Sequence, residues 1–116
     1  MNRLKKTEID LQREISFIIK SKVNDPRIGF ITITYVRLSS DYRYMDAYFS
    51  LMNKEPENIK LCMVALEGCK GFIKKNIKSR IKMKSIPEIR FIYDKSIDNG
   101  LRINSIIENL KLKNID

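Results

Sequence analysis

The 116-residue sequence contains no histidine, and this absence removes the commonest catalytic arrangements. Without an imidazole base, neither a Ser-His nor a Cys-His nucleophile pair can form. The two cysteines, Cys62 and Cys69, lie seven residues apart and make no CxxC pair, so nothing in the sequence completes a zinc site. Carboxylates are not clustered with metal-ligand spacing either. We therefore expect no enzyme, no cofactor and no metal ion, and two reduced, buried cysteines.

Long apolar runs are also missing. No run approaches the roughly 18 residues of a membrane span, and the N-terminus carries neither an apolar signal core nor an acid-free amphipathic presequence. The sequence has no repeat, linker or low-complexity segment, and its hydrophobic content of 43% is enough to fold one modest core. We expect a single domain over residues 1–116, a cytoplasmic monomer that binds no membrane.

Acidic residues are absent between Gly68 and Pro87, and this absence is the most informative one. The fifteen residues from 70 to 84 carry seven cations, which are Lys70, Lys74, Lys75, Lys78, Arg80, Lys82 and Lys84. The whole chain has a net charge of +9, from 23 Lys and Arg against 14 Asp and Glu.

Four of these lysines, at positions 70, 74, 78 and 82, recur every fourth residue, so a helix would align them in a row roughly 18 Å long. Lysines on a solvated helix face are ordinary. Seven cations without acids nevertheless repel one another, and a bound polyanion would relieve that repulsion. The segment therefore favours binding of nucleic acid.

Hydrophobic periodicity predicts alternating helices and strands. Residues 4–23 keep apolar side chains at helical spacing, and Asn24-Asp25-Pro26 ends that helix. Residues 30–39 form a strand whose alternation changes phase near Thr34 and Tyr35, which indicates a β-bulge. Residues 44–51 form a second strand and residues 88–93 a third.

Proline, glycine and isoleucine positions predict the remaining helices. Pro56 suits the first turn of a helix, which Gly68 and Gly71 then interrupt. After the break, a second helix carries a core stripe of Ile73, Ile77 and Ile81 beside the lysine row. Asp94 and Ser96 can cap a last helix, whose apolar residues are Leu101, Ile106, Ile107 and Leu110.

The predicted fold class is α+β, in the order helix, strand, strand, helix, kink, helix, strand, helix. This is the layout of a type II KH domain, an RNA-binding fold with helices packed on one face of a three-stranded sheet. In KH modules a GxxG loop clamps about four nucleotides through backbone N–H groups. Gly68-Cys69-Lys70-Gly71 matches the letters of that loop. Two glycines three residues apart can equally mark a helix kink, so both interpretations stay open.

Eight short motifs occur in the order known from one protein family. They are Asp25-Pro26-Arg27-x-Gly29, Ser39-x-Asp41, Ala65-Leu66, Gly71-Phe72-Ile73, Arg80-x-Lys82-x-Lys84, Pro87-Glu88-Ile89-x-Phe91, Asp94-x-Ser96 and Gly100-x-Arg102-Ile103. Through them the chain resembles the bacterial ribosome-binding factor A family over nearly its whole length. That family has a type II KH-like fold in which an Ala-x-Gly helix kink replaces the GxxG loop. Here Cys69 stands where the family has alanine, and Gly68 restores the letters of a GxxG.

The resemblance implies a non-enzymatic assembly factor that binds the free small (30S) ribosomal subunit and its 16S rRNA late in maturation. It also implies support of growth in the cold and release with the help of a ribosome-maturation GTPase. The candidate RNA-binding residues, read from the chain itself, are Lys70, Lys74, Lys75, Lys78, Arg80, Lys82, Lys84, Arg27 and Arg90. Such phosphate contacts position a protein without reading bases. For Arg27, pairing with an acid inside the fold is an equal alternative.

Two other functions stay open. One is a KH-type regulator that binds single-stranded RNA through residues 68–71, and the other is a protein-binding adaptor with an incidental basic face. Tyr44 and Tyr48 share a strand face and could stack bases, although aromatic residues on strands are more often packed. Asp25, Asp41 and Asp94 lie in turn or cap contexts, where a carboxylate accepts nearby backbone N–H groups.

Overall fold

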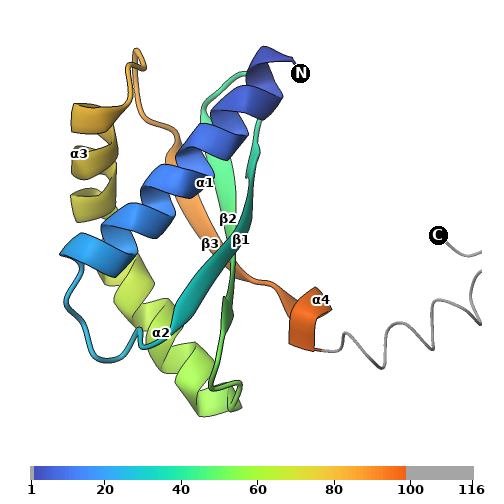
Figure 1. Cartoon of the computed structure of the whole chain (residues 1–116), viewed down its shortest axis with the longest axis vertical. Coiled ribbons are helices and arrows are strands. Elements are labelled where there is room, and N and C mark those ends of the chain that lie inside the picture. The colour runs from blue at the N-terminus through green and yellow to red at the C-terminus, as the bar shows by residue number, and fades with distance from the viewer. Residues whose placement is uncertain (1, 99–116) are drawn as a thin grey trace, which may run out of the picture.

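The computed structural model describes residues 2–98, and these form the predicted α+β arrangement. The elements are α1 (Arg3–Lys22), β1 (Ile31–Leu38), β2 (Tyr44–Leu51), α2 (Pro56–Gly68), α3 (Lys70–Arg80), β3 (Glu88–Tyr93) and α4 (Lys95–Asp98). Figure 1 shows α1 lying across the sheet, with α3 beside it and α2 below. The predicted apolar residues of the last helix, from Leu101 to Leu110, lie outside the described residues.

The first helix follows its sequence pattern closely. The side chain of Asn2 caps its start by accepting a 2.7 Å hydrogen bond from the backbone N–H of Lys5. Four side chains at helical spacing are fully or almost fully buried, at Leu11, Ile15, Ile18 and Ile19. The helix ends at Lys22, and Gly29 adopts a positive φ of 59° in the turn that leads to β1. This helix therefore spans the sheet as the apolar stripe predicts.

The sheet has the strand order β1-β2-β3, with β1 antiparallel to β2 and β2 parallel to β3. The register between β1 and β2 shifts between Ile33 and Tyr35, which confirms the predicted bulge. The shift places Ile33 and Val36 on the buried face and leaves Tyr35 exposed. Because β3 runs parallel to β2, the chain must cross back over the sheet between them, and α2 and α3 form that crossover.

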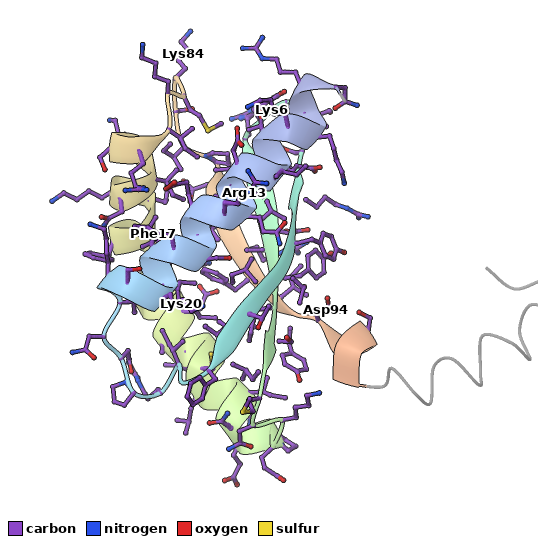
Figure 2. The ribbon with its side chains drawn as sticks, viewed as in Figure 1. Lys6, Arg13, Phe17, Lys20, Lys84 and Asp94 are labelled. Carbon is purple, nitrogen blue, oxygen red and sulfur yellow. The ribbon has the colours of Figure 1, made fainter. Side chains whose placement is uncertain are left out.

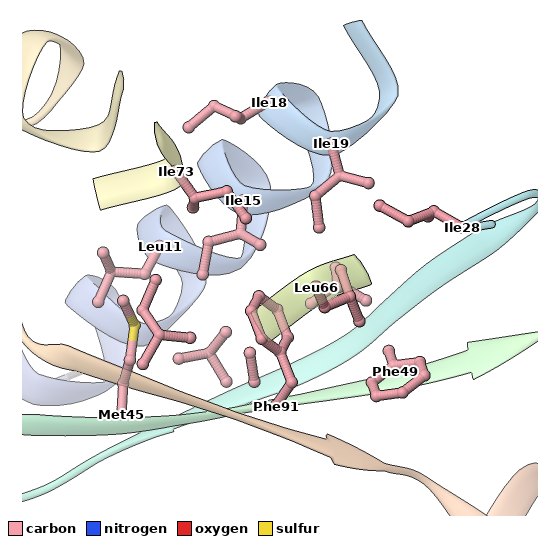
Figure 3. Close-up of a cluster of buried hydrophobic side chains, with 14 of the residues drawn as sticks. Leu11, Ile15, Ile18, Ile19, Ile28, Met45, Phe49, Leu66, Ile73 and Phe91 are labelled. Atoms are coloured by element: carbon pink, nitrogen blue, oxygen red, sulfur yellow. The ribbon is translucent and has the colours of Figure 1, made fainter. Parts of the chain in front are cut away.

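One hydrophobic core lies between the helices and the covered face of the sheet (Figure 3). The inward-facing residues Met45, Ala47 and Phe49 of β2 are at most 1% exposed, as their alternation predicts. The ring of Phe49 meets the ring of Phe91 edge to face, with centroids 6.5 Å apart. Leu66 of α2 and Ile73 of α3 close the core from the helix layer. The opposite face of the sheet carries the outward-facing residues of the alternating pattern.

Candidate nucleic-acid interface

The break between α2 and α3 is a helix kink at a single residue, Cys69. Its backbone has φ −108° and ψ 11°, while Gly68 ends one helix and Lys70 begins the next. The Cys69 N–H donates to the carbonyl of Leu66 at 3.2 Å, and its own carbonyl accepts from the N–H of Ile73 at 2.9 Å. Hydrogen bonding therefore continues through the break, and no GxxG loop of extended backbone forms here.

Packing within the protein does not require glycine at either of the two glycine positions of the kink. Neither Gly68 nor Gly71 has a positive φ, and a Cβ built on either would have no atom within 4 Å among the described residues. The turn containing Asp25 and Arg27 borders the kink, close enough for its charges to act on the Cys69 thiol. The kink is therefore open on its outer side and edged by an ion pair.

The third helix ends earlier than the lysine spacing predicts. Ile73 and Ile77 are fully buried, which confirms the helix phase, but Ile81 is only partly buried and follows the last helical residue, Arg80. Lys82 and Lys84 lie in the loop between α3 and β3, and Figure 2 shows Lys84 at the tip of that loop. The predicted helical row of four lysines is thus wrong in its last member.

The physical reason is the parallel strand pairing. Glu88 must pair with Tyr44 at the start of β2, so the chain has to leave the helix and turn back toward the sheet before Pro87. A helix that continued through Lys82 would carry the chain past that position. The helical row therefore contains Lys70, Lys74 and Lys78 alone.

Three of the seven cations in the segment have acidic partners within the fold. We call Lys70, Lys74 and Arg80 the paired cations. The ammonium group of Lys70 lies 2.6 Å from a Glu67 carboxylate oxygen, and that of Lys74 lies 2.6 Å from Glu88. Hydrogen bonding from Lys74 lowers the pKa of Glu88, so this carboxyl group stays charged to lower pH than usual.

Arg80 reaches α1 rather than solvent. Its guanidinium hydrogen-bonds the carboxylate of Glu14 and also lies over the ring of Phe17, 4.4 Å from the ring centroid. These contacts tie α3 to α1. Arg80 is therefore a packing residue of the two helices as well as a charge beside the surface.

The remaining four cations form no ion pair with any acid among the side chains that the structure describes, those of residues 2–96. We call Lys75, Lys78, Lys82 and Lys84 the unpaired cations, and all four are exposed. Three of them line a hollow of about 600 Å³ between α3, the α3–β3 loop and the start of β2. Its complete lining is Arg43, Tyr44, Lys74, Lys75, Lys78, Lys84, Ser85, Ile86 and Glu88. The structure thus gathers uncompensated positive charge around one concave surface.

Arg27 and Arg90 both pair with acids inside the fold. The guanidinium of Arg27 donates to both carboxylate oxygens of Asp25, at 3.0 and 2.7 Å, while keeping 48% of its side chain exposed. Arg90 does the same to its strand neighbour Asp46, at 2.9 and 3.1 Å, with 72% of its side chain exposed. These bonds raise the pKa of each arginine. Neither residue lines the lysine-rich hollow.

Two groups of surface cations were not among the RNA-binding candidates predicted from the sequence. Arg43 joins the hollow because β2 begins beside β3, and no local pattern reveals a parallel pairing across a crossover. Arg13 and Lys20 lie along the outer face of α1 with the half-exposed Phe17, as Figure 2 shows. The signal for them was present, since both fall on the polar side of the first helix.

The aspartates of the turns serve the backbone, as predicted. Asp25 accepts from the N–H of Arg27, Asp41 from that of Arg43 and Asp94 from that of Ser96, at 3.0, 3.2 and 3.0 Å. Asp94 also accepts a 2.7 Å hydrogen bond from the Thr34 hydroxyl at the bulge. Burial alone would raise the pKa of Asp94, but the hydrogen bonds from Ser96 and Thr34 lower it on balance.

The strand tyrosines divide into two kinds. The rings of Tyr35 and Tyr48 stack on each other with centroids 4.2 Å apart, so each covers one face of the other. Tyr44 is 57% exposed and makes no stacking contact with another ring in the described residues. The structure thus confirms packing for Tyr48 and leaves the ring of Tyr44 free.

Both cysteines are free thiols, but only one is buried. Cys62 is fully buried, which raises the pKa of its thiol to about 11. Cys69 is only partly buried, so the prediction of burial is wrong for this residue, because the kink turns it toward the surface. Residues 2–98 contain no group of three or more His, Cys, Asp or Glu that could hold a metal ion. No helix within the same residues is long and apolar enough to cross a membrane.

Comparison with known proteins gives one consistent result. The family model described as Ribosome-binding factor A matches residues 3–107. A ribosome-binding factor A from Lacticaseibacillus casei is 32% identical over 99% of this chain and 98% of its own length. That of Halothermothrix orenii is 44% identical over 87% of this chain and 82% of its own.

Solved structures agree with these sequence relatives. A candidate ribosome binding factor A from Thermotoga maritima, solved by solution NMR, matches with a TM-score of 0.70 and 33% identity over 79% of this chain and 90% of its own. The crystal structure of ribosome-binding factor A from Thermus thermophilus shares the fold, with a TM-score of 0.69 and 24% identity over 78% and 93% of the two chains. A further match, with a TM-score of 0.63 and 23% identity over 76% and 91%, is the Thermus thermophilus homology model fitted into a cryo-EM map of its 30S complex.

Proposed function

Because the chain belongs to the ribosome-binding factor A family, we propose that it is a non-enzymatic assembly factor of the small ribosomal subunit. It binds the free 30S subunit and its 16S rRNA during late maturation. The Thermus thermophilus relative, whose homology model was fitted into a map of a 30S complex, supports this partner. We propose that it acts in the cytoplasm, where small subunits mature.

The observation that carries the proposal is the set of four unpaired cations. A cation without an internal partner gives up no ion pair when it meets a phosphate, so its full charge is available for binding. Lys75, Lys78 and Lys84 surround one hollow, and Lys82 lies beside them in the same loop. Phosphate contacts of this kind fix position without reading bases, so specificity comes from the shape of the folded RNA.

The other five candidates contribute less. Lys70, Lys74, Arg80, Arg27 and Arg90 each already hold a carboxylate, and an RNA phosphate must compete with it. Lys70, Lys74 and Arg27 extend the positive surface toward the kink and Arg80 extends it toward α1, while Arg90 lies beside Asp46 on the sheet. We assign them secondary contacts at the edge of the interface.

The family resemblance supports a wider proposal about the biological setting. We propose that residues 1–116 act as one unit and as a monomer, that the protein supports growth in the cold, and that a ribosome-maturation GTPase acting through the subunit helps release it. An assembly factor must leave before translation begins, so binding should be selective for immature particles.

Co-sedimentation tests this function directly. The full chain is mixed with free small subunits, with mature subunits and with whole ribosomes, and the bound fraction is measured after centrifugation. We expect recovery with free small subunits and much less with translating ribosomes. Equal or greater recovery in polysomes would contradict the proposal.

A further inference from the structure

Tyr44 forms a shared wall between two neighbouring hollows. On one side lies the lysine-rich hollow described above. On the other lies a smaller one of about 390 Å³, lined by Arg37, Leu38, Ser39, Tyr44, Met45, Asp46 and Arg90. The ring of Tyr44, 57% exposed, is therefore reached from both sides. No other aromatic side chain lines either hollow among the described residues.

The two hollows differ in chemistry in the way that the two parts of a nucleotide differ. The larger one holds Arg43 and three unpaired lysines against a single carboxylate, that of Glu88, which Lys74 already neutralises. It suits phosphate groups and offers little to a base.

The smaller hollow combines one aromatic ring with polar groups. Leu38 and Met45 line it along the two strands, but their side chains are almost completely buried in the core, so the exposed ring of Tyr44 is its aromatic surface. Asp46 and Arg90 stand at its edge as a bound pair that still presents an acceptor and several donors. The Tyr44 ring with this polar pair beside it suits the flat face and the polar edge of a base.

We propose that Tyr44 is the stacking platform for one unpaired RNA base. The base lies on the Tyr44 ring toward Arg37 and Arg90, and the phosphates of that nucleotide and its neighbours lie among Lys75, Lys78 and Lys84. This inference rests on the proposed function, since it names the feature of the RNA that the surface recognises. Base stacking on an aromatic ring tolerates any base, so the site selects an unpaired nucleotide and not a sequence.

Three other aromatic residues of the sheet region, Tyr35, Tyr48 and Phe30, fit this role less well. Tyr35 and Tyr48 already cover each other on the open face of the sheet. Phe30 is 80% exposed but lies at the opposite end of the β1–β2 ladder, where Ile31 pairs with Leu51. The separation from Tyr44 is roughly 23 Å along β2 at about 3.3 Å per residue. Phe30 is therefore a matched control, an exposed aromatic residue far from both hollows.

The test uses two RNA hairpins that differ by one nucleotide. One is fully paired, and the other carries a single bulged 2-aminopurine, whose fluorescence falls when the base stacks. The wild-type protein should bind the bulged hairpin about 5- to 140-fold more tightly, which is the range that one stacked base contributes. It should also quench the 2-aminopurine.

Four variants separate stacking from general binding. Tyr44→Ala should lose both the preference and the quenching, while Tyr44→Phe and Phe30→Ala should keep both. Lys75→Ala combined with Lys78→Ala should weaken both hairpins alike and keep the preference. Circular dichroism of each variant confirms that it is folded.

Two results would overturn the inference. One is equal affinity of the wild type for the two hairpins, and the other is a loss in Tyr44→Ala that is the same for both. Either would leave the proposed function standing if co-sedimentation with free small subunits persists. Conversely, failure of co-sedimentation with a preserved hairpin preference would reject the ribosomal assignment and keep the base-stacking site.

Discussion

The two ends of the acid-free segment differ in how many of their cations already have acidic partners. At the kink end, Lys70 and Lys74 lie against Glu67 and Glu88. At the other end, Arg80 pairs with Glu14, but Lys75, Lys78, Lys82 and Lys84 have no acidic partner among the side chains described for residues 2–96. The sequence stretch is free of acids, yet acids from α2 and β3 return to it in space. Counting cations along a chain therefore overstates the charge that a polyanion can use.

The comparison also separates two ways of holding RNA. A KH-type loop would place phosphates at the backbone of the kink, where two glycines leave open space. The unpaired cations instead point to the far end of α3 as the principal contact. The five predictions that follow test this difference, beginning with the largest effect.

A substitution on the buried side of α3 should have the largest effect on stability, and it changes none of the cations. Ile77 is fully buried on the core face of α3, so Ile77→Ala should lower the free energy of unfolding by about 2 to 5 kcal/mol. Urea denaturation measures the loss. A change well below 1 kcal/mol would mean that the helix phase is wrong and that both cation groups are misplaced.

Removing charge at the two ends should have unequal effects. Lys75→Ala with Lys78→Ala removes two free contacts and should weaken binding to small subunits by about 10- to 100-fold. Lys70→Ala with Lys74→Ala also removes two charges. Because these lysines are already paired with Glu67 and Glu88, they contribute less to RNA binding, and the loss of affinity should stay below about 5-fold. Filter binding at one salt concentration compares the two double variants. Equal losses would erase the distinction between the ends.

Salt dependence counts the contacts at the hollow end. If the four unpaired cations each neutralise a phosphate, log affinity against log salt should have a slope of about −3 to −4. Lys78→Ala should make the slope shallower by about one unit, whereas Lys70→Ala should change it by much less. Titrations at several salt concentrations measure both slopes. A wild-type slope near zero would show that the lysines are only a solvated face.

Glu88→Gln should convert a paired cation into a free one. Without the carboxylate, Lys74 gains access to phosphate, and binding should strengthen by about 2- to 5-fold with a steeper salt slope. The pKa of Glu88 is lowered in the folded state, so the pair stabilises the wild type above the unfolded pKa and is lost as pH falls through the folded one. The variant should therefore lose less stability than the wild type as pH drops below about 4.5. Weaker binding of Glu88→Gln would show that the pair positions Lys74 for RNA.

Gly71→Ala should produce the smallest change, and it tests whether RNA contacts the backbone of the kink. The position is helical and a Cβ there meets nothing, so alanine should raise stability by about 0.5 to 1 kcal/mol. Binding to small subunits should remain within about 2-fold of the wild type, because the substitution alters no charge. A stabilised variant that no longer binds RNA would instead show that phosphates approach the kink backbone.

Much of the fold could be predicted from the sequence because its signals are local. The apolar stripe of α1, the phase change at the bulge and Pro56 at the start of α2 each depend on residues within a few positions of one another. The candidate site was predicted less completely. Arg80 meets Glu14 across 66 residues and Arg90 meets Asp46 across 44, and no pattern within one segment reveals such partners. The early end of α3 has the same origin, since strand pairing at Glu88 decides it.

The crossover between β2 and β3 affects when the lysine-rich hollow forms during folding. The walls of the lysine-rich hollow come from the start of β2, from α3 and from the loop before β3, so they meet only when the parallel pairing at Tyr44 and Glu88 has closed. Pairings between distant segments form late in folding, after the local helices. A newly made chain can thus display its lysines on α3 well before it possesses the concave surface. RNA that requires the hollow would engage only finished molecules, and binding would serve as a check on completed folding.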